Sequence, residues 1–80
     1  MKITLYGYLA QMIAPELELA WPGPSSIADL RAELAEAYPA AAGALTRGVV
    51  RACVDGALVP EDFLVRDVDL VEFLPPVSGG

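Results

Sequence analysis

Residues 25–39 read SSIADLRAELAEAYP, and this stretch carries the signals of one complete helix. Ser26, followed three positions later by Asp29, resembles a capping box with Asp in place of the usual Glu or Gln. Pro39 stops the run because proline cannot continue a helix. Apolar residues recur at helical spacing, namely Ile27, Leu30, Leu34 and Ala37 or Tyr38. The residues expected on the outward-facing side of the helix are Asp29, Arg31, Glu33 and Glu36. The pattern predicts a helix that packs one apolar stripe on a sheet.

Two strands are expected before this helix. Residues 2–9, KITLYGYL, alternate with a period of two, and one face would carry Ile3, Leu5, Gly7 and Leu9. After a connection that ends near Pro15, a second alternating run places on one face Leu17, Leu19 and Trp21. Pro22-Gly23-Pro24 closes this second strand. We expect the two strands to pair as a hairpin.

Three more strands are expected after the helix. Residues 40–46 are small and are interpreted as a connection. Asp55-Gly56 suits the positive φ values of a tight turn, so residues 49–54 and 57–59 should form a short hairpin. Residues 60–69 are interpreted as turn and irregular structure. Residues 70–74, LVEFL, form an apolar run with Glu72 as its only charge, which predicts a central, buried last strand.

This order of elements predicts an α+β domain with a β-grasp arrangement, in which a mixed sheet of four to five strands packs on one main helix. Residues 1–74 would form the domain and residues 75–80 a flexible, extended C-terminal tail. Pro75 and Pro76 lack backbone N–H groups, so the chain cannot continue pairing normally and should leave the body as a stiff extended exit. Gly79 and Gly80 allow close approaches that a Cβ would block, so this end could be threaded into a narrow pocket.

Composition excludes several classes of function. The chain has 80 residues, 11 acidic and 5 basic side chains, no histidine and a formal net charge of −6, which argues against nucleic acid as a partner. The single cysteine, Cys53, allows no internal disulfide and no Cys-rich zinc site, which favours a reducing, cytoplasmic setting. No apolar run approaches the roughly 20 residues of a membrane helix. We therefore expect a protein without a membrane or a metal site.

Residues 73–80, FLPPVSGG, resemble the C-terminus of the molybdopterin synthase small subunit, in the MoaD/ThiS-like family of ubiquitin-related sulfur carriers. At residue level the resemblance is sharp only for this segment. The family often carries Asp-Gly-Asp before the last strand, where this chain has Asp67-Val68-Asp69. Its first strand also commonly runs into an aromatic pair and Arg-Glu, whereas this chain has Tyr6-Gly7-Tyr8 and later Gln11-Met12. These departures affect partner specificity more than tail chemistry.

The resemblance implies that an E1-like adenylyltransferase activates the Gly80 carboxylate with ATP and that a sulfur-donating enzyme then gives a thiocarboxylate. The large subunit, in a heterotetramer, would receive the tail and transfer the sulfur to cyclic pyranopterin monophosphate. This chain would bind no cofactor itself, because the ATP belongs to the activating partner. The inserted residues would be Pro75, Pro76, Val77, Ser78, Gly79 and Gly80.

Several assignments stay open. A partner interface could include Tyr6, Tyr8, Phe73, Asp67 and Asp69, although core packing is an equal reading for Phe73, and acids such as Asp67 and Asp69 are usually only solvated. Cys53 is interpreted as a buried structural thiol, since no histidine could activate it. The alternatives in function are a carrier for thiamine synthesis or tRNA thiolation, a protein modifier joined through Gly80 to a lysine, and an adapter that is never activated.

Overall fold

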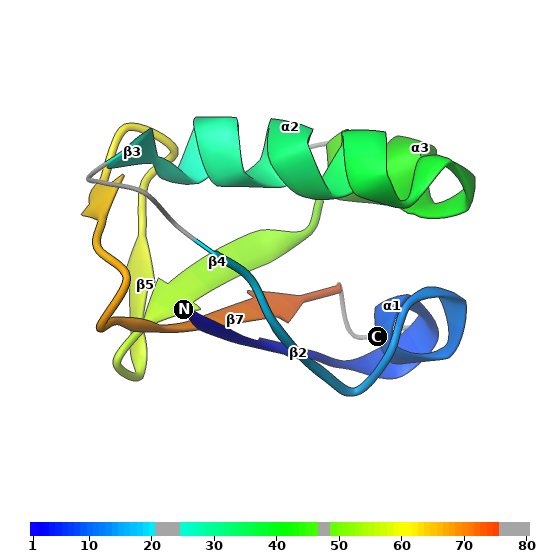
Figure 1. Ribbon diagram of the computed structural model, residues 1–80, viewed down its shortest axis with the longest axis horizontal. Helices are drawn as coiled ribbons and strands as arrows, with labels where there is room; N and C mark the ends of the chain where they lie inside the picture. Colours follow the sequence, from blue (N-terminus) through cyan, green and yellow to red (C-terminus); the bar gives the residue numbers. More distant parts are fainter. Residues whose placement is uncertain (21–24, 47–48, 76–80) are drawn as a thin grey trace.

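Two layers make up the molecule, a five-stranded sheet and a helical layer that covers one face of it (Figure 1). The computed structural model describes residues 1–20, 25–46 and 49–75. In chain order the elements are β1 (Lys2–Leu5), α1 (Gly7–Met12), β2 (Glu16–Glu18), β3 (Ser25–Ser26), α2 (Ile27–Ala37), the 3-10 helix η1 (Pro39–Ala41), α3 (Ala42–Thr46), β4 (Arg51–Val54), β5 (Ala57–Val59), β6 (Leu64–Val65) and β7 (Leu70–Leu74).

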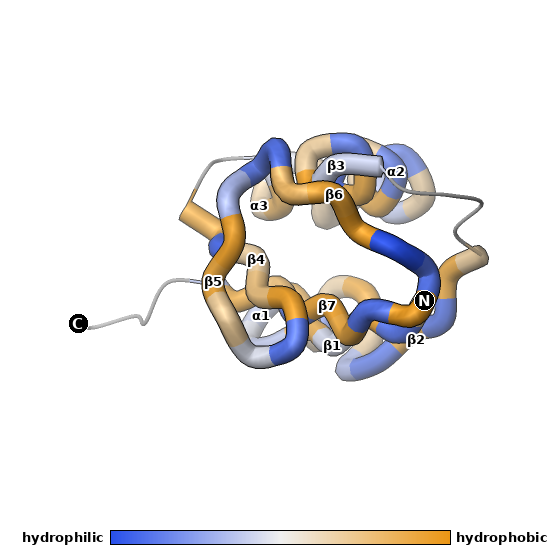
Figure 2. The backbone as a smooth tube through the Cα atoms, turned by 90° about the vertical axis from the view of Figure 1, so that its left-hand side faces the viewer, coloured by the Kyte–Doolittle hydropathy of each residue, from blue (hydrophilic) through white to orange (hydrophobic). Residues whose placement is uncertain are grey.

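The main sheet is mixed, with the strand order β2-β1-β7-β4-β5. β1 and β7 run parallel, with Leu5 opposite Phe73, and the other pairs are antiparallel. β3 and β6 form a separate two-stranded sheet, which lies beside α2 in the end-on view of Figure 2. These features confirm the predicted α+β, β-grasp architecture with β7 in the centre of the sheet and β1 paired to β2.

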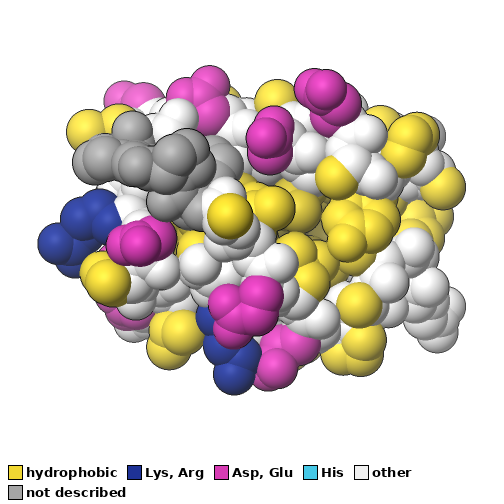
Figure 3. Space-filling model, in the orientation of Figure 1, with side chains coloured by type: hydrophobic (Ala, Val, Ile, Leu, Met, Phe, Trp, Pro, Cys, Tyr) yellow, Lys and Arg dark blue, Asp and Glu magenta, His cyan; other side chains and the backbone are white. Residues whose placement is uncertain are grey.

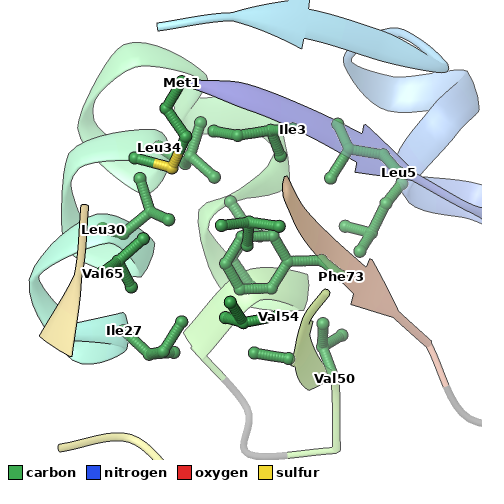
Figure 4. Close-up of a cluster of buried hydrophobic side chains, with 14 of the residues drawn as sticks. Met1, Ile3, Leu5, Ile27, Leu30, Leu34, Val50, Val54, Val65 and Phe73 are labelled. Carbon is green, nitrogen blue, oxygen red and sulfur yellow. The ribbon is translucent and has the colours of Figure 1, made fainter. Parts of the chain in front are cut away.

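The core lies between the sheet and α2, and its side chains follow the two expected periodicities. Alternate residues of the central strands are buried on one face, where Phe73 lies at the middle of the cluster in Figure 4. α2 contributes a stripe at helical spacing. The fully buried large side chains are Ile3, Leu9, Ile27, Leu30, Leu34, Leu45, Val50, Val65, Val71 and Phe73. Leu70, at the start of β7, is 54% exposed, so the last strand is buried on only one face.

α2 begins at the predicted capping box. The Ser26 hydroxyl accepts a hydrogen bond from the Asp29 backbone N–H (3.0 Å), and the Asp29 carboxylate accepts one from the Ser26 N–H (3.3 Å). Asp29 also accepts a bond from the Ser25 hydroxyl (2.6 Å), and this bond, followed by those from Ser26, lowers the pKa of Asp29 below 3.8. The reciprocal bonds satisfy N–H groups that every helix start leaves unpaired.

Three predictions about local structure were wrong. The first strand ends at Leu5, and residues 7–12 form α1 instead of continuing the alternation. The small residues of the expected connection form η1 and α3, since no β-branched or charged side chain interrupts Ala40–Leu45 and Pro39 suits the first turn of a helix. Residues 64–65 form β6, within a stretch expected to be irregular. Trp21 and Pro22–Pro24, the predicted end of the second strand, lie outside the described residues.

The outward assignment of Arg31 was also wrong, because the residue is only 7% exposed. Its guanidinium donates to both carboxylate oxygens of Glu61 (2.9 and 2.6 Å) and to the Leu45 carbonyl (2.6 Å). A buried charge is tolerated only when it is paired and hydrogen-bonded, and Arg31 meets both conditions. It therefore ties α2 to α3 and to the segment before β6.

The hairpin of β4 and β5 confirms its prediction. Asp55 has a φ of 51° and Gly56 a φ of 86°, so both central turn residues are left-handed, as a tight hairpin turn requires. Asp55 also accepts a hydrogen bond from the Leu70 N–H (3.3 Å), which joins the turn to the start of β7.

Candidate functional site

The candidate site lies where the chain leaves the body at the end of β7. Because β7 runs parallel to β1, its last residues lie beside the end of β1, and Arg51 at the start of β4 is paired with Leu74 on the other side. Pro75 is half-buried and is the last described residue. The remaining tail residues of the predicted site, Pro76, Val77, Ser78, Gly79 and Gly80, lie outside the described part of the chain. The described site is therefore the exit and its surroundings.

Gly7 packs against the exit. It has a φ of 59°, and a Cβ built on it would lie 3.0 Å from Cγ of Pro75. Both the left-handed backbone and the close approach favour glycine over any residue with a side chain. The start of α1 therefore lies directly against the first proline of the exit.

Tyr6 and Glu72 connect β7 to the residue before α1. The Tyr6 hydroxyl donates to Oε2 of Glu72 at 2.5 Å, on the face of the sheet away from α2. This hydrogen bond is the main cause that raises the pKa of Tyr6 above 10.0, and desolvation and the negative charge of Glu72 act in the same direction. Tyr6 is 40% exposed and Tyr8 39%, so both predicted interface tyrosines are accessible near the exit.

Phe73 cannot contact a partner in this structure, because its side chain is fully buried. The Arg31 guanidinium carbon lies 5.3 Å from the centre of its ring, a cation–π contact. The core-packing interpretation of Phe73 is therefore correct and the interface interpretation wrong. Phe73 acts on the exit only indirectly, by fixing the strand that leads into it.

Asp67 and Asp69 lie at the other end of β7. The five residues of this strand lie between Asp69 and Pro75, so six steps of about 3.3 Å separate the two by roughly 20 Å. Asp69 is 5% exposed, and its carboxylate accepts hydrogen bonds from the Arg66 backbone N–H (2.9 Å) and guanidinium (3.4 Å). Asp67 is exposed in the same turn. An acidic docking patch beside the tail was therefore a wrong interpretation of these two residues.

An uncharged pocket lies beside the exit, and the sequence pattern did not indicate it. It has a volume of about 310 Å³ and is lined by Tyr8, Met12, Ala40, Gly43, Ala44 and Val49. We call it the tail-end pocket. Met12 is 49% exposed and Val49 48%. In Figure 3, hydrophobic side chains reach the end of the molecule where α1 and α3 lie. The spacing of Tyr8 and Met12, four residues apart, fits a helix but does not indicate a pocket.

The remaining predictions concern Cys53, metal ions and membranes. Cys53 is buried in β4, as predicted. Among residues 1–20, 25–46 and 49–75, no group of three or more His, Cys, Asp or Glu side chains is placed to hold a metal ion. No helix in these ranges is long and apolar enough to span a membrane.

The model of the ThiS family matches residues 3–80, which is nearly the whole chain. The chain belongs to the ThiS family. This membership confirms the resemblance to MoaD/ThiS-like, ubiquitin-related sulfur carriers. No curated protein matches the sequence significantly.

Solved structures that are similar to this ThiS-family chain agree on the fold. SAMP1 from Haloferax volcanii superposes with a TM-score of 0.86 at 20% identity, covering 99% of this chain and 97% of that one. A second structure, of H. volcanii small archaeal modifier protein 1, gives 0.84 at 17% identity with 95% of each chain covered. A putative molybdopterin converting factor, subunit 1, from Pyrococcus furiosus gives 0.79 at 22% identity, again with 95% of each chain covered.

Proposed function

We propose that this ThiS-family chain is the sulfur-carrying small subunit of a molybdopterin synthase. Its Gly80 carboxylate would be adenylated, converted to a thiocarboxylate and used as the sulfur donor to cyclic pyranopterin monophosphate in the pocket of the large subunit. The observation that carries the proposal is the segment of residues 73–80, FLPPVSGG, whose first two residues are the last two of the central strand of the sheet.

The exit geometry supports a tail that acts on a partner. Phe73 is locked in the core, Pro75 packs against Gly7, and only five residues follow Pro75. A tail that starts from a fixed point reaches its target with less loss of conformational freedom than one that starts from a loose segment. The folded domain would therefore be the part that the partner binds, and it would present the short tail that ends in the reactive carboxylate of Gly80.

The chemistry divides between the chain and its partners. A carboxylate oxygen of Gly80 attacks the α-phosphorus of ATP, and pyrophosphate leaves. A sulfide equivalent from the sulfur-donating enzyme then attacks the acyl carbon, and AMP leaves. A glycyl end gives the least steric hindrance to this attack. The ATP site, the acid–base groups and the pterin site would belong to the partners.

A protein modifier joined through Gly80 to a lysine is the second candidate. Two of the similar structures are of a small archaeal modifier protein, and their fold is that of this chain. The first step, adenylation of Gly80, is common to both candidates. They differ in the group that attacks the acyl adenylate, which is sulfur in one and a lysine amine in the other.

The deciding experiment follows the mass of the intact chain. The purified protein is incubated with the E1-like enzyme and the sulfur-donating enzyme of its native host and with ATP. We expect one oxygen to be replaced by sulfur, and we expect this sulfur to appear in molybdopterin when the large subunit and cyclic pyranopterin monophosphate are added. A chain extended by one residue after Gly80 is the control and should stay unmodified.

Two outcomes would contradict the proposal. Thiocarboxylate that forms but is used only by thiamine or tRNA-thiolation enzymes would reassign the carrier to another pathway. Isopeptide adducts to lysine in native extracts, without sulfur transfer to the pterin, would identify a modifier.

A further inference from the structure

We infer that the tail-end pocket receives an apolar side chain projecting from the enzyme that adenylates Gly80. The inference rests on the proposed function, because it concerns how the activating enzyme holds the body while it acts on the tail. The occupant is defined by its chemistry, an uncharged aliphatic or aromatic side chain on a partner that approaches the exit.

The length of the tail forces the enzyme against this end of the domain. Five residues follow Pro75, and a fully extended chain spans at most about 3.6 Å per residue, so Gly80 lies within roughly 18 Å of the exit. An ATP site is enclosed by protein on several sides, and the body of the domain must therefore come to rest on the rim of that site. The surface around Pro75 becomes the contact surface.

The tail-end pocket belongs to this surface. Gly7 lies against Pro75, and the next residue, Tyr8, lines the pocket. Leu70 is also exposed, but it begins the strand that Pro75 follows and so lies at the other end of that strand. Met12 and Val49 complete the pocket from α1 and from the segment before β4.

The lining decides what kind of side chain fits. The chain has a net charge of −6, yet none of the six lining residues is charged. Tyr8, Met12 and Val49 leave between 39% and 49% of their surface exposed, which is apolar area that a partner could bury. A basic side chain would find no carboxylate here, so an apolar one gains most. Methionine also adapts its shape to different occupants.

The test compares two Val→Glu variants. Val49→Glu places a charge in the pocket, whereas Val68→Glu makes the same change at a 74% exposed residue in the turn before β7, at the other end of that strand. ATP–pyrophosphate exchange by the E1-like enzyme of the native host is measured against carrier concentration. We expect Val49→Glu to raise KM for the carrier about tenfold, equivalent to about 1.4 kcal/mol, with kcat retained, and Val68→Glu to match the wild type.

A second variant fills the pocket without charge. A Cβ on Gly43 would meet no heavy atom within 4 Å, so Gly43→Leu should fold and occupy space that the partner needs. Gly43→Leu should raise KM for the carrier as Val49→Glu does. If Val49→Glu folds poorly, the KM of Gly43→Leu alone tests whether the partner occupies the pocket. Unchanged KM for the folded variants would overturn the inference while leaving the proposed function intact. A wild-type chain that is not adenylated at all would overturn both.

Sedimentation velocity of the free chain tests a different occupant. We expect a monomer. A homodimer that Val49→Glu dissociates and Val68→Glu does not would assign the pocket to a second copy of this chain and would refute the inference.

Discussion

The hydroxyl of Tyr6 donates a 2.5 Å hydrogen bond to Oε2 of Glu72, and so joins the residue before α1 to the strand that carries the tail. Tyr6 follows directly after β1, which runs parallel to β7 with Thr4 paired with Glu72. With the contact of Gly7 and Pro75, this bond gives the exit two attachments to the same turn.

Replacing Glu72 should lower the pKa of Tyr6. The Glu72 carboxylate favours the neutral phenol, so the pKa of Tyr6 in the folded state is raised above 10.0. The hydrogen bond between the two side chains therefore stabilises the fold fully below pH 10, and this stabilisation is lost as pH rises through the pKa of the folded state. We expect Glu72→Gln to move the tyrosinate absorbance transition of Tyr6 to lower pH. Glu36→Gln, at an exposed position of α2, is the matched control and should leave the transition unchanged.

Replacing Gly7 with alanine should destabilise the domain. The left-handed φ of 59° costs a residue with a Cβ about 1–2 kcal/mol, and the 3.0 Å approach to Pro75 adds to this. Gly43→Ala is the control, because its Cβ meets open space in a helix, where Ala is favoured over Gly by about 1 kcal/mol. Urea unfolding should give opposite signs for the two changes, and equal stabilities would contradict this account.

The same residue explains why part of the fold could not be predicted. Ile3, Leu5, Gly7 and Leu9 satisfy a period of two, and Leu5 and Leu9 are both buried, as they would be in one strand. They are also four residues apart, so they satisfy the helical period as well. The strand ends where Gly7 takes a left-handed φ, beside a contact with Pro75 that joins residues 68 positions apart, and no local pattern contains that contact.

Arg31 shows the opposite case, in which the pattern did contain the answer. It follows Ile27 by four positions and precedes Leu34 by three, so geometry places it on the buried stripe. Charge alone suggested the outer side. The partners that make burial possible, Glu61 and the Leu45 carbonyl, come from other segments and could not be anticipated from the helix.

Removing the Arg31 side chain should cost about 3 kcal/mol. The change leaves the Leu45 carbonyl and the Glu61 carboxylate without their donor and removes the contact on the Phe73 ring. Arg51→Ala, at an exposed residue of β4, should stay within about 0.5 kcal/mol. Chemical denaturation measures both, and a loss for Arg31→Ala as small as that for Arg51→Ala would refute the role assigned here.

The capping box should make the domain sensitive to acid. The pKa of Asp29 is lowered below 3.8 in the folded state, so its contribution is fully present above about pH 4 and is lost as pH falls through the folded value. Thermal melts from pH 7 to pH 2 should therefore show a gap between wild type and Asp29→Asn that closes in acid. A gap independent of pH would show that the charge of Asp29 is not involved.

Deleting Gly79 and Gly80 should separate folding from function. The core ends with Phe73, so the free energy of unfolding should change by no more than about 0.5 kcal/mol. Adenylation should be lost, because the reacting carboxylate would be withdrawn by two residues. Melts and pyrophosphate exchange on the same preparation test both statements, and a lowered melting temperature would place the tail within the folded unit.

The candidate site was predictable to the extent that it is local in sequence. The Pro-Pro and Gly-Gly pairs, together with exposed Tyr6 and Tyr8, could be identified from residue types alone. The tail-end pocket could not, because its walls come from α1, η1, α3 and the segment before β4. Asp67 and Asp69 were misjudged for a different reason: both precede the strand over residues 70–74 and the tail follows it, so the order of the chain already placed them at the opposite end of that strand.

The parallel pairing of β1 and β7 has a mechanical consequence. A partner that grips the C-terminus and pulls, while the N-terminus is held, loads the two central strands in opposite directions along their length. The hydrogen bonds between them are then strained together in shear and cannot open one at a time, as they would at the end of an antiparallel hairpin. The domain is thus built to withstand tension applied through its own reactive end.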